Sequence, residues 1–421
     1  MSSQEKNIIA VDSLPSDVLH GATYSIEQAN PNSFTHGFFK YPCKFIPEIP
    51  RWAIKKYLGD EGDVYDPFSG SGTTLLEGIL SGHTSFGSEI DEIARLVTKV
   101  KTTPLNGEQL EELTTLAAGI VSSARRDNTP MVIPRIHNLS HWFNDENTRY
   151  LGKLKFLIEE VRDKDIRDFL NVCFVSIIKR TSNADDVSPK PYVSRKVIKT
   201  PPNALEEFAQ TVKRYFNSIE EFSMLNTVKE AVLLEGDALD IRLDKQIDLA
   251  ITSPPYINAF DYARTLRLEN LWYGALDEQE IREKKKEYVG TESLKMDEEE
   301  KDLQILNESK LLSHYYNAIL PKDRKRALIV KRFFADMREN LIQVKRVLRS
   351  GGHYVIVIGD SSIRNVEIES WRVLEDIALG LGFETQLTFR YVIKNPYIRI
   401  PRKNRGGKIK YDNVLVLKKV N

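Results

Sequence analysis

The hydrophobic positions of this chain form short apolar runs separated by longer amphipathic stretches. Most runs are rich in β-branched residues and end in glycine, proline or acidic residues, which is typical of buried strands. Several stretches between them repeat apolar residues at three and four positions, as helices do. We therefore predict seven strands with alternating helices, beginning near Val64, Thr84, Ala231, Ile247, Gly351, Glu384 and Asn413.

This order predicts an α/β fold, a doubly wound and mostly parallel seven-stranded sheet of the Rossmann-like kind. Two segments depart from a minimal fold of this kind: residues 103–229 are mostly helical by pattern, and residues 277–330 form a charged excursion. Residues 1–30 are polar and lack a period, so we expect a flexible arm. The catalytic domain would then comprise residues 31–102 and 230–421, interrupted by the helical insertion 103–229.

The fourth strand, Ile247–Thr252, leads directly into Ser253, Pro254, Pro255 and Tyr256. Two prolines cannot continue a strand ladder, so the chain must leave the sheet at its carboxyl edge, where open α/β sheets bind ligands. A loop fixed by prolines suits methylation of an exocyclic amine on a nucleobase. The hydroxyl of Ser253 and the carbonyl of Pro254 would accept hydrogen bonds from the amine, and Tyr256 would stack on an extruded (flipped) base. An ordinary turn with a surface tyrosine is the alternative.

The first strand runs into a second loop, Asp66-Pro67-Phe68-Ser69-Gly70-Ser71-Gly72, before Thr73 opens a helix. Glycines at Gly70 and Gly72 let the backbone approach a ligand, and the amino end of a helix favours a negative charge such as a carboxylate. The spacing differs from the dinucleotide motif G-x-G-x-x-G, which argues against a pyrophosphate cofactor.

Two acidic residues follow the next strands. Glu89 ends the second strand, where an acid in nucleotide-binding folds takes both hydroxyls of a ribose. Asp237 ends the third strand and could accept a hydrogen bond from an adenine amino group. A solvated helix cap is the alternative interpretation of Glu89.

Composition limits the functional classes. The chain has 421 residues and is 41% hydrophobic, which is enough for a sizeable core. No apolar run approaches a membrane span and no secretory leader is evident, so we expect a cytoplasmic protein without membrane contact. Cys43 and Cys173 are too few for a disulfide framework or a zinc site, and no metal is implied.

The net charge of zero hides an asymmetry, because residues 390–421 hold ten Lys or Arg and one acid, Asp412. Only part of the surface can then face a polyanion.

With these motifs in place, the chain resembles the S-adenosylmethionine-dependent DNA amino-methyltransferases of the cytosine-N4/adenine-N6 type. The cofactor loop Asp66–Gly72 and the catalytic loop Ser253–Tyr256 carry the resemblance, which covers about residues 35–100 and 230–421. It implies a class I methyltransferase fold with S-adenosylmethionine as cofactor. It also implies that Lys44 and Phe45 pack on the methionine moiety, with Asp66, Pro67, Phe68, Gly70, Gly72, Thr73, Glu89 and Asp237 completing the cofactor site.

The expected partner is double-stranded DNA, and a cognate restriction endonuclease would be a functional partner. The inter-helix loop 188–202 combines bases and a tyrosine without an acid, and we take Lys190, Tyr192, Arg195 and Lys196 as candidates for reading DNA. The basic segment between the last two strands suits phosphates, with Arg402, Lys403 and Arg405 as its candidates. A solvated loop is the alternative for residues 188–202.

Several functions remain open at this point. Ser253 favours cytosine N4, because the adenine-N6 enzymes of the family usually carry Asp or Asn there. Cytosine-C5 methylation needs a thiolate, and Cys43 precedes the cofactor loop rather than occupying the catalytic loop. RNA guanine-N2 methylation is weakened by the absence of a recognisable RNA-binding module. A catalytically silent DNA-binding regulator would not need an intact Ser-Pro-Pro-Tyr loop, and cofactor turnover would distinguish it.

Overall fold

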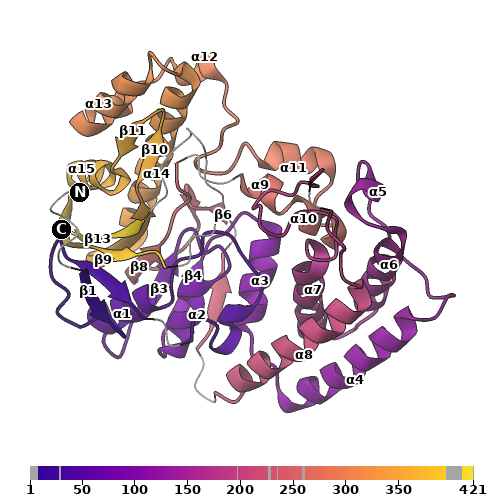
Figure 1. The fold of residues 1–421 in the computed structure, drawn as a ribbon. Coiled ribbons are helices and arrows are strands. Elements are labelled where there is room, and N and C mark those ends of the chain that lie inside the picture. The colour runs from indigo at the N-terminus through magenta and orange to yellow at the C-terminus, as the bar shows by residue number, and fades with distance from the viewer. Residues whose placement is uncertain are drawn as a thin grey trace.

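A computed structural model describes residues 8–27, 30–196, 198–225, 229–234, 236–257, 261–394 and 410–420. Its central sheet has nine strands, and two small hairpins lie outside it (Figure 1). The sheet strands are β1 (Ile8–Val11), β2 (Thr23–Ile26), β3 (Asp63–Asp66), β4 (Thr84–Gly87), β5 (Ala231–Leu233), β8 (Ile247–Thr252), β9 (Leu348–Gly359), β12 (Phe383–Val392) and β13 (Tyr411–Lys419). The hairpins are β6 (Gly236–Asp237) with β7 (Asp240–Ile241), and β10 (Ser361–Ile363) with β11 (Val366–Ile368).

The strand order is β1-β2-β12-β13-β9-β8-β3-β4-β5. All neighbours run parallel except β13, which is antiparallel to both β12 and β9. The chain moves outward from β3 through β4 to β5 and then returns to β8 on the other side of β3. This switch point leaves a crevice at the carboxyl ends of β3 and β8, where open sheets bind ligands. The predicted doubly wound, mostly parallel α/β fold is confirmed.

Alternating residues of the central strands feed two cores, one on each face of the sheet. Val64, Leu249 and Val355 pack with helix α1 (Glu48–Tyr57) on one face. Their neighbours Tyr65 and Ala250 pack with helices α14 (Arg324–Val347) and α15 (Ser370–Gly380) on the other face. Because the strands are buried on both faces, their apolar runs are nearly continuous.

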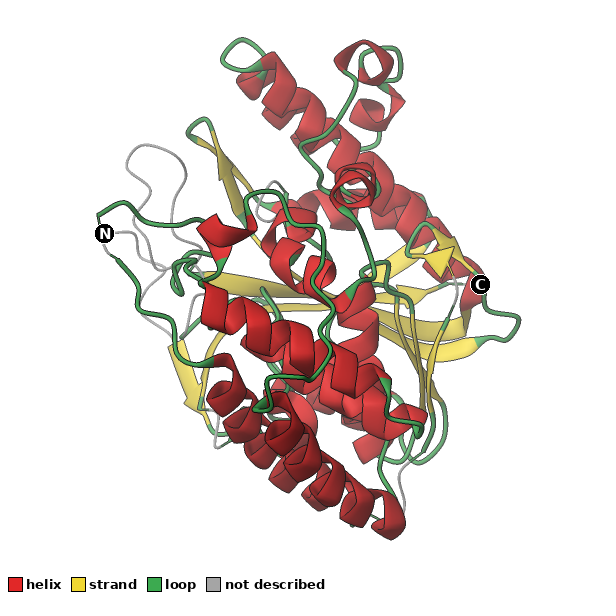
Figure 2. Cartoon of the chain, turned by 90° about the vertical axis from the view of Figure 1, so that its right-hand side faces the viewer, coloured by secondary structure: helices red, strands yellow, loops and turns green. Residues whose placement is uncertain are grey.

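The longer helices are distributed over the sheet faces and the insertion (Figure 2). Those near the sheet are α1 (Glu48–Tyr57), α2 (Thr73–Leu80), α3 (Glu92–Thr102), α13 (Lys310–Ile319), α14 (Arg324–Val347) and α15 (Ser370–Gly380). Those of the insertion are α4 (Gly107–Ala124), α5 (Leu139–Trp142), α6 (Asp145–Glu159), α7 (Lys164–Ile178) and α8 (Ala204–Ser223). Short helices follow the catalytic loop: α9 (Tyr262–Thr265), α10 (Arg267–Tyr273), α11 (Glu278–Lys284) and α12 (Met296–Glu299). The 3₁₀ helices are η2 (Phe34–Gly37) and η3 (Gln304–Asn307).

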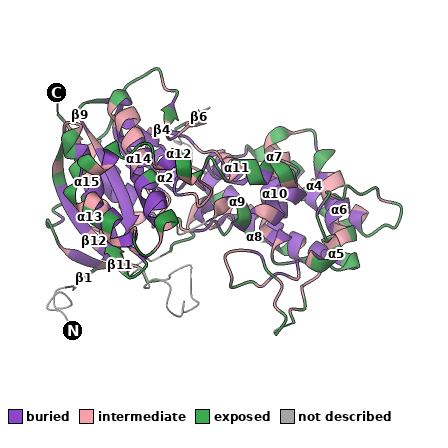
Figure 3. Ribbon diagram, turned by 90° about the horizontal axis from the view of Figure 1, so that it is seen from above, coloured by how far each residue is buried: buried purple, intermediate pink, exposed green. Residues whose placement is uncertain are grey.

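The insertion is helical, as the pattern predicts, and it forms a second lobe beside the sheet (Figure 3). Helix α10, which lies between the catalytic loop and the charged excursion 277–330, packs on α7, and Trp272 is buried against Phe143 and Phe174. Ile281 and Tyr288 of the excursion 277–330 belong to the same apolar core as the insertion, and this core continues onto α3 beneath the cofactor loop. In the described part of the chain, no helix is long and apolar enough to cross a membrane.

The prediction of a flexible arm over residues 1–30 is wrong for residues 8–26. Strand β2 pairs parallel with β12, and β1 adds a further parallel strand, so the sheet has two strands beyond the seven predicted. Tyr24 and Ile26 are buried, and the Tyr24 ring meets Phe389 edge-on. Strands of four residues are too short to show a period, and β1 and β2 are ordered by this long-range packing.

Two further expectations need correction. The predicted third strand, Ala231–Ala238, ends at Leu233, and Gly236–Asp237 belongs to the separate hairpin β6–β7. The alternating charges of residues 284–302 predict an exposed helical face, but only α12 and the end of α11 are helical there, and Tyr288 and Val289 are buried. These charges mask the apolar residues in the sequence pattern.

Candidate active site

Strand β3 ends at Asp66, whose buried carboxylate organises the two loops at the switch point. Its Oδ2 accepts a hydrogen bond from Thr74 Oγ1 at 2.6 Å, and its Oδ1 accepts from Thr252 Oγ1 at 2.6 Å. The backbone N–H of Phe68 donates to Oδ1 at 3.0 Å. Burial raises the pKa of Asp66 to about 6, while these hydrogen bonds oppose that rise. Asp66 thus ties the cofactor loop to β8, and its side chain lies behind the cavity wall.

The two glycines of the cofactor loop have left-handed backbone conformations, with φ of +51° at Gly70 and +79° at Gly72. A Cβ atom at Gly70 would lie 3.2 Å from Tyr41 Cε1, and one at Gly72 would lie 2.7 Å from Thr98 Cγ2. Both positions therefore require glycine, for backbone conformation and for space. Gly72 is the residue immediately before α2.

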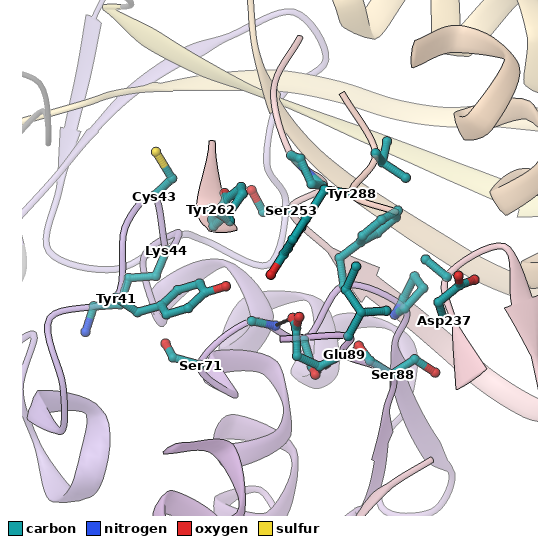
Figure 4. Close-up of a pocket in the computed structure, with 18 of the residues that line it drawn as sticks. Tyr41, Cys43, Lys44, Ser71, Ser88, Glu89, Asp237, Ser253, Tyr262 and Tyr288 are labelled. Atoms are coloured by element: carbon teal, nitrogen blue, oxygen red, sulfur yellow. Dashed lines mark hydrogen bonds between the residues drawn. The ribbon is translucent and has the colours of Figure 1, made fainter. Parts of the chain in front are cut away.

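A cavity that is open to solvent lies between the cofactor loop and the catalytic loop. Many of the predicted site residues line it together: Lys44, Phe45, Pro67, Phe68, Gly70, Thr73, Glu89, Asp237, Ser253 and Pro255. Figure 4 shows Tyr41, Lys44 and Ser71 at one end, Ser88 and Asp237 at the other, and Glu89 between them.

Glu89 lies in the middle of the cavity and is held by backbone donors. Its Oε2 accepts from the N–H of Gly70 at 2.8 Å, and its Oε1 accepts from the N–H of Asp91 at 2.8 Å. Burial, together with the charge of Asp91, raises the pKa of Glu89 to about 7. A carboxylate fixed in this way can still accept hydrogen bonds from a ligand, because each oxygen has a second lone pair.

At the far end, Asp237 closes the hairpin β6–β7 with Oδ1, which accepts from the N–H groups of Leu239 and Asp240 at 2.6 and 3.0 Å. At the near end, the ammonium of Lys44 donates to the carbonyl of His36 at 2.8 Å, and burial lowers the pKa of Lys44. One end of the cavity thus carries a carboxyl group, from Asp237, and the other carries an amine, from Lys44 (Figure 4).

The catalytic loop contributes Ser253 and Pro255 to the cavity wall, while Pro254 and Tyr256 lie outside it. Ser253 Oγ is buried and makes no hydrogen bond within the described ranges. The Tyr256 hydroxyl donates to Asp412 Oδ1 at 2.6 Å, and Tyr391 donates to Oδ2 of the same carboxylate at 2.9 Å. Tyr256 is therefore fixed by the last strand of the sheet rather than exposed in the cavity.

Aromatic residues outside the two loops form another part of the wall. The rings of Tyr41, Tyr262 and Tyr288 stack in series, with centroids 6.0 and 5.9 Å apart and planes within 23° and 15° of parallel. Two of these tyrosines lie in segments whose sequence suggests a pocket wall: Tyr41 in the aromatic and proline-rich segment 35–50, and Tyr262 shortly after the catalytic loop. Tyr288 gives no such signal, because it stands within alternating charges. Its hydroxyl donates to Asp91 Oδ2 at 2.8 Å.

Cys43 also lines the cavity, next to the catalytic loop. Burial and the nearby charge of Asp412 raise the pKa of its thiol far above the ordinary value. Cytosine-C5 methylation needs a thiolate, and an elevated pKa keeps this thiol protonated. The geometry therefore does not favour that chemistry.

The predicted reading loop 188–202 has a fixed base and an exposed tip. Lys199 Nζ donates to the carbonyl of Ala184 at 3.0 Å and pairs with Asp186 at 2.8 Å. At the tip, Arg195 and Lys196 are exposed and Tyr192 is 43% exposed. Lys190 is half-buried. Burial lowers its pKa, and the charges of Asp261 and Glu292 oppose that shift. The loop thus lies beside the segment that follows the catalytic loop. Arg402, Lys403 and Arg405 lie outside the described residues.

Comparison with known proteins gives relatives over most of the chain. The Type II methyltransferase M.MvaI of Kocuria varians is 25% identical over 402 residues, which cover 89% of this chain and 87% of that protein. The Type II methyltransferase M.BsoBI of Geobacillus stearothermophilus is 28% identical over 339 residues, covering 70% of this chain and 62% of that protein. No protein-family model matches. The structure of the glycopeptide N-methyltransferase MtfA with S-adenosylmethionine is 9% identical, covers 89% of this chain and 94% of its own, and has a TM-score of 0.30. The resemblance carried by the two loops is confirmed by the Type II methyltransferase relatives.

Proposed function

We propose that this chain, a relative of the Type II methyltransferases along most of its length, transfers a methyl group from S-adenosylmethionine to N4 of cytosine in duplex DNA. The observation that carries the proposal is the hydroxyl of Ser253, which is buried in the wall of the cavity and makes no hydrogen bond within the described residues. Buried polar atoms normally have partners, so a hydroxyl of this kind awaits a ligand. An exocyclic amine supplies the missing donor.

The chemistry requires acceptors because the lone pair of an exocyclic amine is delocalised into the ring. Hydrogen bonds from the amine to Ser253 Oγ and the Pro254 carbonyl favour the tetrahedral nitrogen that can attack a methyl group. The new carbon–nitrogen bond forms as the carbon–sulfur bond breaks, the sulfur becomes neutral, and the nitrogen releases one proton to solvent. The adjacent prolines fix the acceptors before the reaction, which reduces the reorganisation that the transition state needs.

The cavity residues divide naturally among the parts of the cofactor. Glu89 would take the ribose hydroxyls, and Asp237 with Phe68 would border the adenine. The end formed by Lys44, Phe45 and Thr73 would receive the methionine part, because it combines a buried ammonium with the amino end of α2. In this assignment the sulfonium methyl would point toward Ser253. The residues predicted from the sequence would hold the cofactor, and the proposal needs no metal ion.

DNA recognition is proposed at the loop 188–202 and at the basic tail 390–410. The fixed base of the loop and its exposed Arg195 and Lys196 suit a reading role, and the basic tail would contact phosphates. We further propose that the chain acts in a restriction-modification system, protecting sites from a cognate endonuclease. The relatives named above support such a role, since both are described as Type II methyltransferases.

The test is nucleoside mass spectrometry of DNA from a methylation-free host that expresses the chain. We expect N4-methylcytosine, and we expect Ser253→Ala to reduce it strongly without loss of cofactor affinity. A Ser182→Ala variant is a matched control, because this buried serine lies in the insertion and bonds only to its own segment. N6-methyladenine or 5-methylcytosine in place of N4-methylcytosine would refute the target assignment. Cofactor binding without any methylated base would indicate a silent DNA-binding protein.

A further inference from the structure

Helix α3 lies behind the cofactor loop and sends two polar side chains toward it. Thr98 Oγ1 donates to the carbonyl of Gly70 at 2.9 Å. One turn further along, Lys101 Nζ donates to Ser71 Oγ at 3.3 Å. The Lys101 side chain has an exposed fraction of 0%, and Ser71 is 2% exposed. An ammonium is therefore enclosed immediately behind the cavity wall.

This buried ammonium lacks an acidic partner. Within the part of the chain that the structure describes, no carboxylate pairs with Lys101 or with Lys44. Glu77 is the acid bonded to neighbouring His36 at 2.8 Å, but it is also paired with Arg51 at 2.7 Å. Burial and the charge of Lys44 lower the pKa of Lys101 well below its ordinary value. Burying two ammonium groups side by side without an anion is costly, so a bound anion would relieve this end of the cavity.

Ser71 connects Lys101 to the cavity. Its hydroxyl lines the wall at the end shared with Lys44 and Tyr41, opposite Ser88 and Asp237 (Figure 4). Because this hydroxyl accepts the bond from Lys101, its own proton can be donated to a ligand. Thr73, two residues later, begins α2, so the helix terminus adds a favourable potential for an anion at the same end.

We propose that Lys101, acting through the hydroxyl of Ser71, supplies the positive charge that holds the carboxylate of the cofactor's methionine part. The inference rests on the proposed function, because it takes S-adenosylmethionine as the ligand. Lys101 is a positioning residue here, since Ser71 makes the contact. The role lies outside the cofactor loop and the aromatic segment, on a helix whose sequence shows only an amphipathic pattern.

The test compares three ligands on four proteins by isothermal titration calorimetry. S-adenosylhomocysteine has the carboxylate, its decarboxylated analogue retains only the amine, and 5′-methylthioadenosine lacks both groups. The variants are Lys101→Met, Ser71→Ala and, as a matched control, Lys99→Met. Lys99 lies on the same helix but pairs with Asp168 at 2.5 Å and Asp165 at 3.3 Å, away from the cavity.

We expect Lys101→Met to weaken S-adenosylhomocysteine roughly tenfold to a hundredfold, as for the loss of one charge-assisted hydrogen bond. Binding of the other two ligands should stay unchanged. Ser71→Ala should give the same pattern, and Lys99→Met should affect none of the three. Equal weakening of all ligands by Lys101→Met would overturn the inference and show a structural role. If Lys101→Met fails to fold, unchanged S-adenosylhomocysteine affinity in Ser71→Ala overturns it. A wild-type chain that binds none of the ligands refutes the proposed function itself.

Discussion

Asp412 holds Tyr256 in place, and its removal gives a direct test of how the catalytic loop works. The carboxylate is 7% exposed and accepts from Tyr256 at 2.6 Å and from Tyr391 at 2.9 Å. Burial raises the pKa of Asp412, and the two hydroxyls oppose that rise. One carboxylate thus fixes the ring of a catalytic-loop tyrosine to strand β13.

The Asp412→Ala change leaves two buried hydroxyls without an acceptor. Each costs about 1–3 kcal/mol, which is partly offset because a buried carboxyl is removed. The Tyr256 ring also gains freedom to rotate. If its orientation supports stacking of the extruded base, up to ~1–3 kcal/mol of that interaction is lost. This loss predicts a decrease of roughly fivefold to a hundredfold in kcat/KM for DNA. Cofactor affinity should not change, because Asp412 does not line the cavity.

The assay is single-turnover methylation of a target duplex, with cofactor affinity by calorimetry and stability by urea unfolding. Tyr391→Phe is the control, because it removes the second bond to Asp412 and leaves the bond to Tyr256 intact. It should lower stability but keep turnover. A folded Asp412→Ala protein that methylates at the wild-type rate would refute the reasoning. So would a Tyr391→Phe protein that is equally slow.

Four further predictions concern the cofactor cavity and the proposed reading loop. Because the pKa of Glu89 is raised from 4.5 to about 7, cofactor affinity measured by calorimetry should increase as pH rises through about 7, and Glu89→Gln should abolish this dependence. The raised pKa of Glu89 also links this residue to stability. Its contribution to the free energy of unfolding is complete below pH 4 and is lost as pH rises through about 7. Urea unfolding of the wild type, compared with Glu89→Gln, should show a loss of ~3 kcal/mol over this range. Gly70→Val should abolish cofactor binding, since φ is +51° and its Cβ would lie 3.2 Å from the Tyr41 ring; unchanged calorimetric affinity would contradict this. The double change Arg195→Ala with Lys196→Ala should lower discrimination between target and scrambled duplexes by roughly 1–3 kcal/mol for each lost base contact. Binding titrations at several salt concentrations measure this. An equal loss of affinity on both duplexes would show that the two side chains bind only phosphates.

The sequence was sufficient for the sheet core and for the two loops at its switch point. The central strands are buried on both faces, so their apolar runs are visible without tertiary information. The glycine and proline motifs then fix where the chain leaves the sheet, because few residues can adopt those backbone conformations. Lys44, Glu89, Asp237 and Ser253 meet at one cavity for this reason.

The remaining features depend on long-range packing, which local patterns do not show. Strands β1 and β2 exist because Tyr24 and Ile26 pack against the far end of the sheet. Lys101 stands on the helix face that packs toward the loop, but a lysine in an amphipathic helix normally indicates solvent. Asp412 is the second residue of β13, 156 positions after Tyr256. The sequence around Lys101 and around Asp412 therefore shows no pattern that would predict these contacts.

The packing of the insertion brings the proposed reading loop close to the segment that follows the catalytic loop. Helix α10 follows that loop closely and is buried against α7, which directly precedes the segment leading to residues 188–202. The charge of Lys190 in the proposed reading loop interacts with that of Asp261, the residue immediately before α9. The proposed reading loop, α7 and α10 therefore belong to one packed region of the molecule, beside the segment that follows the catalytic loop.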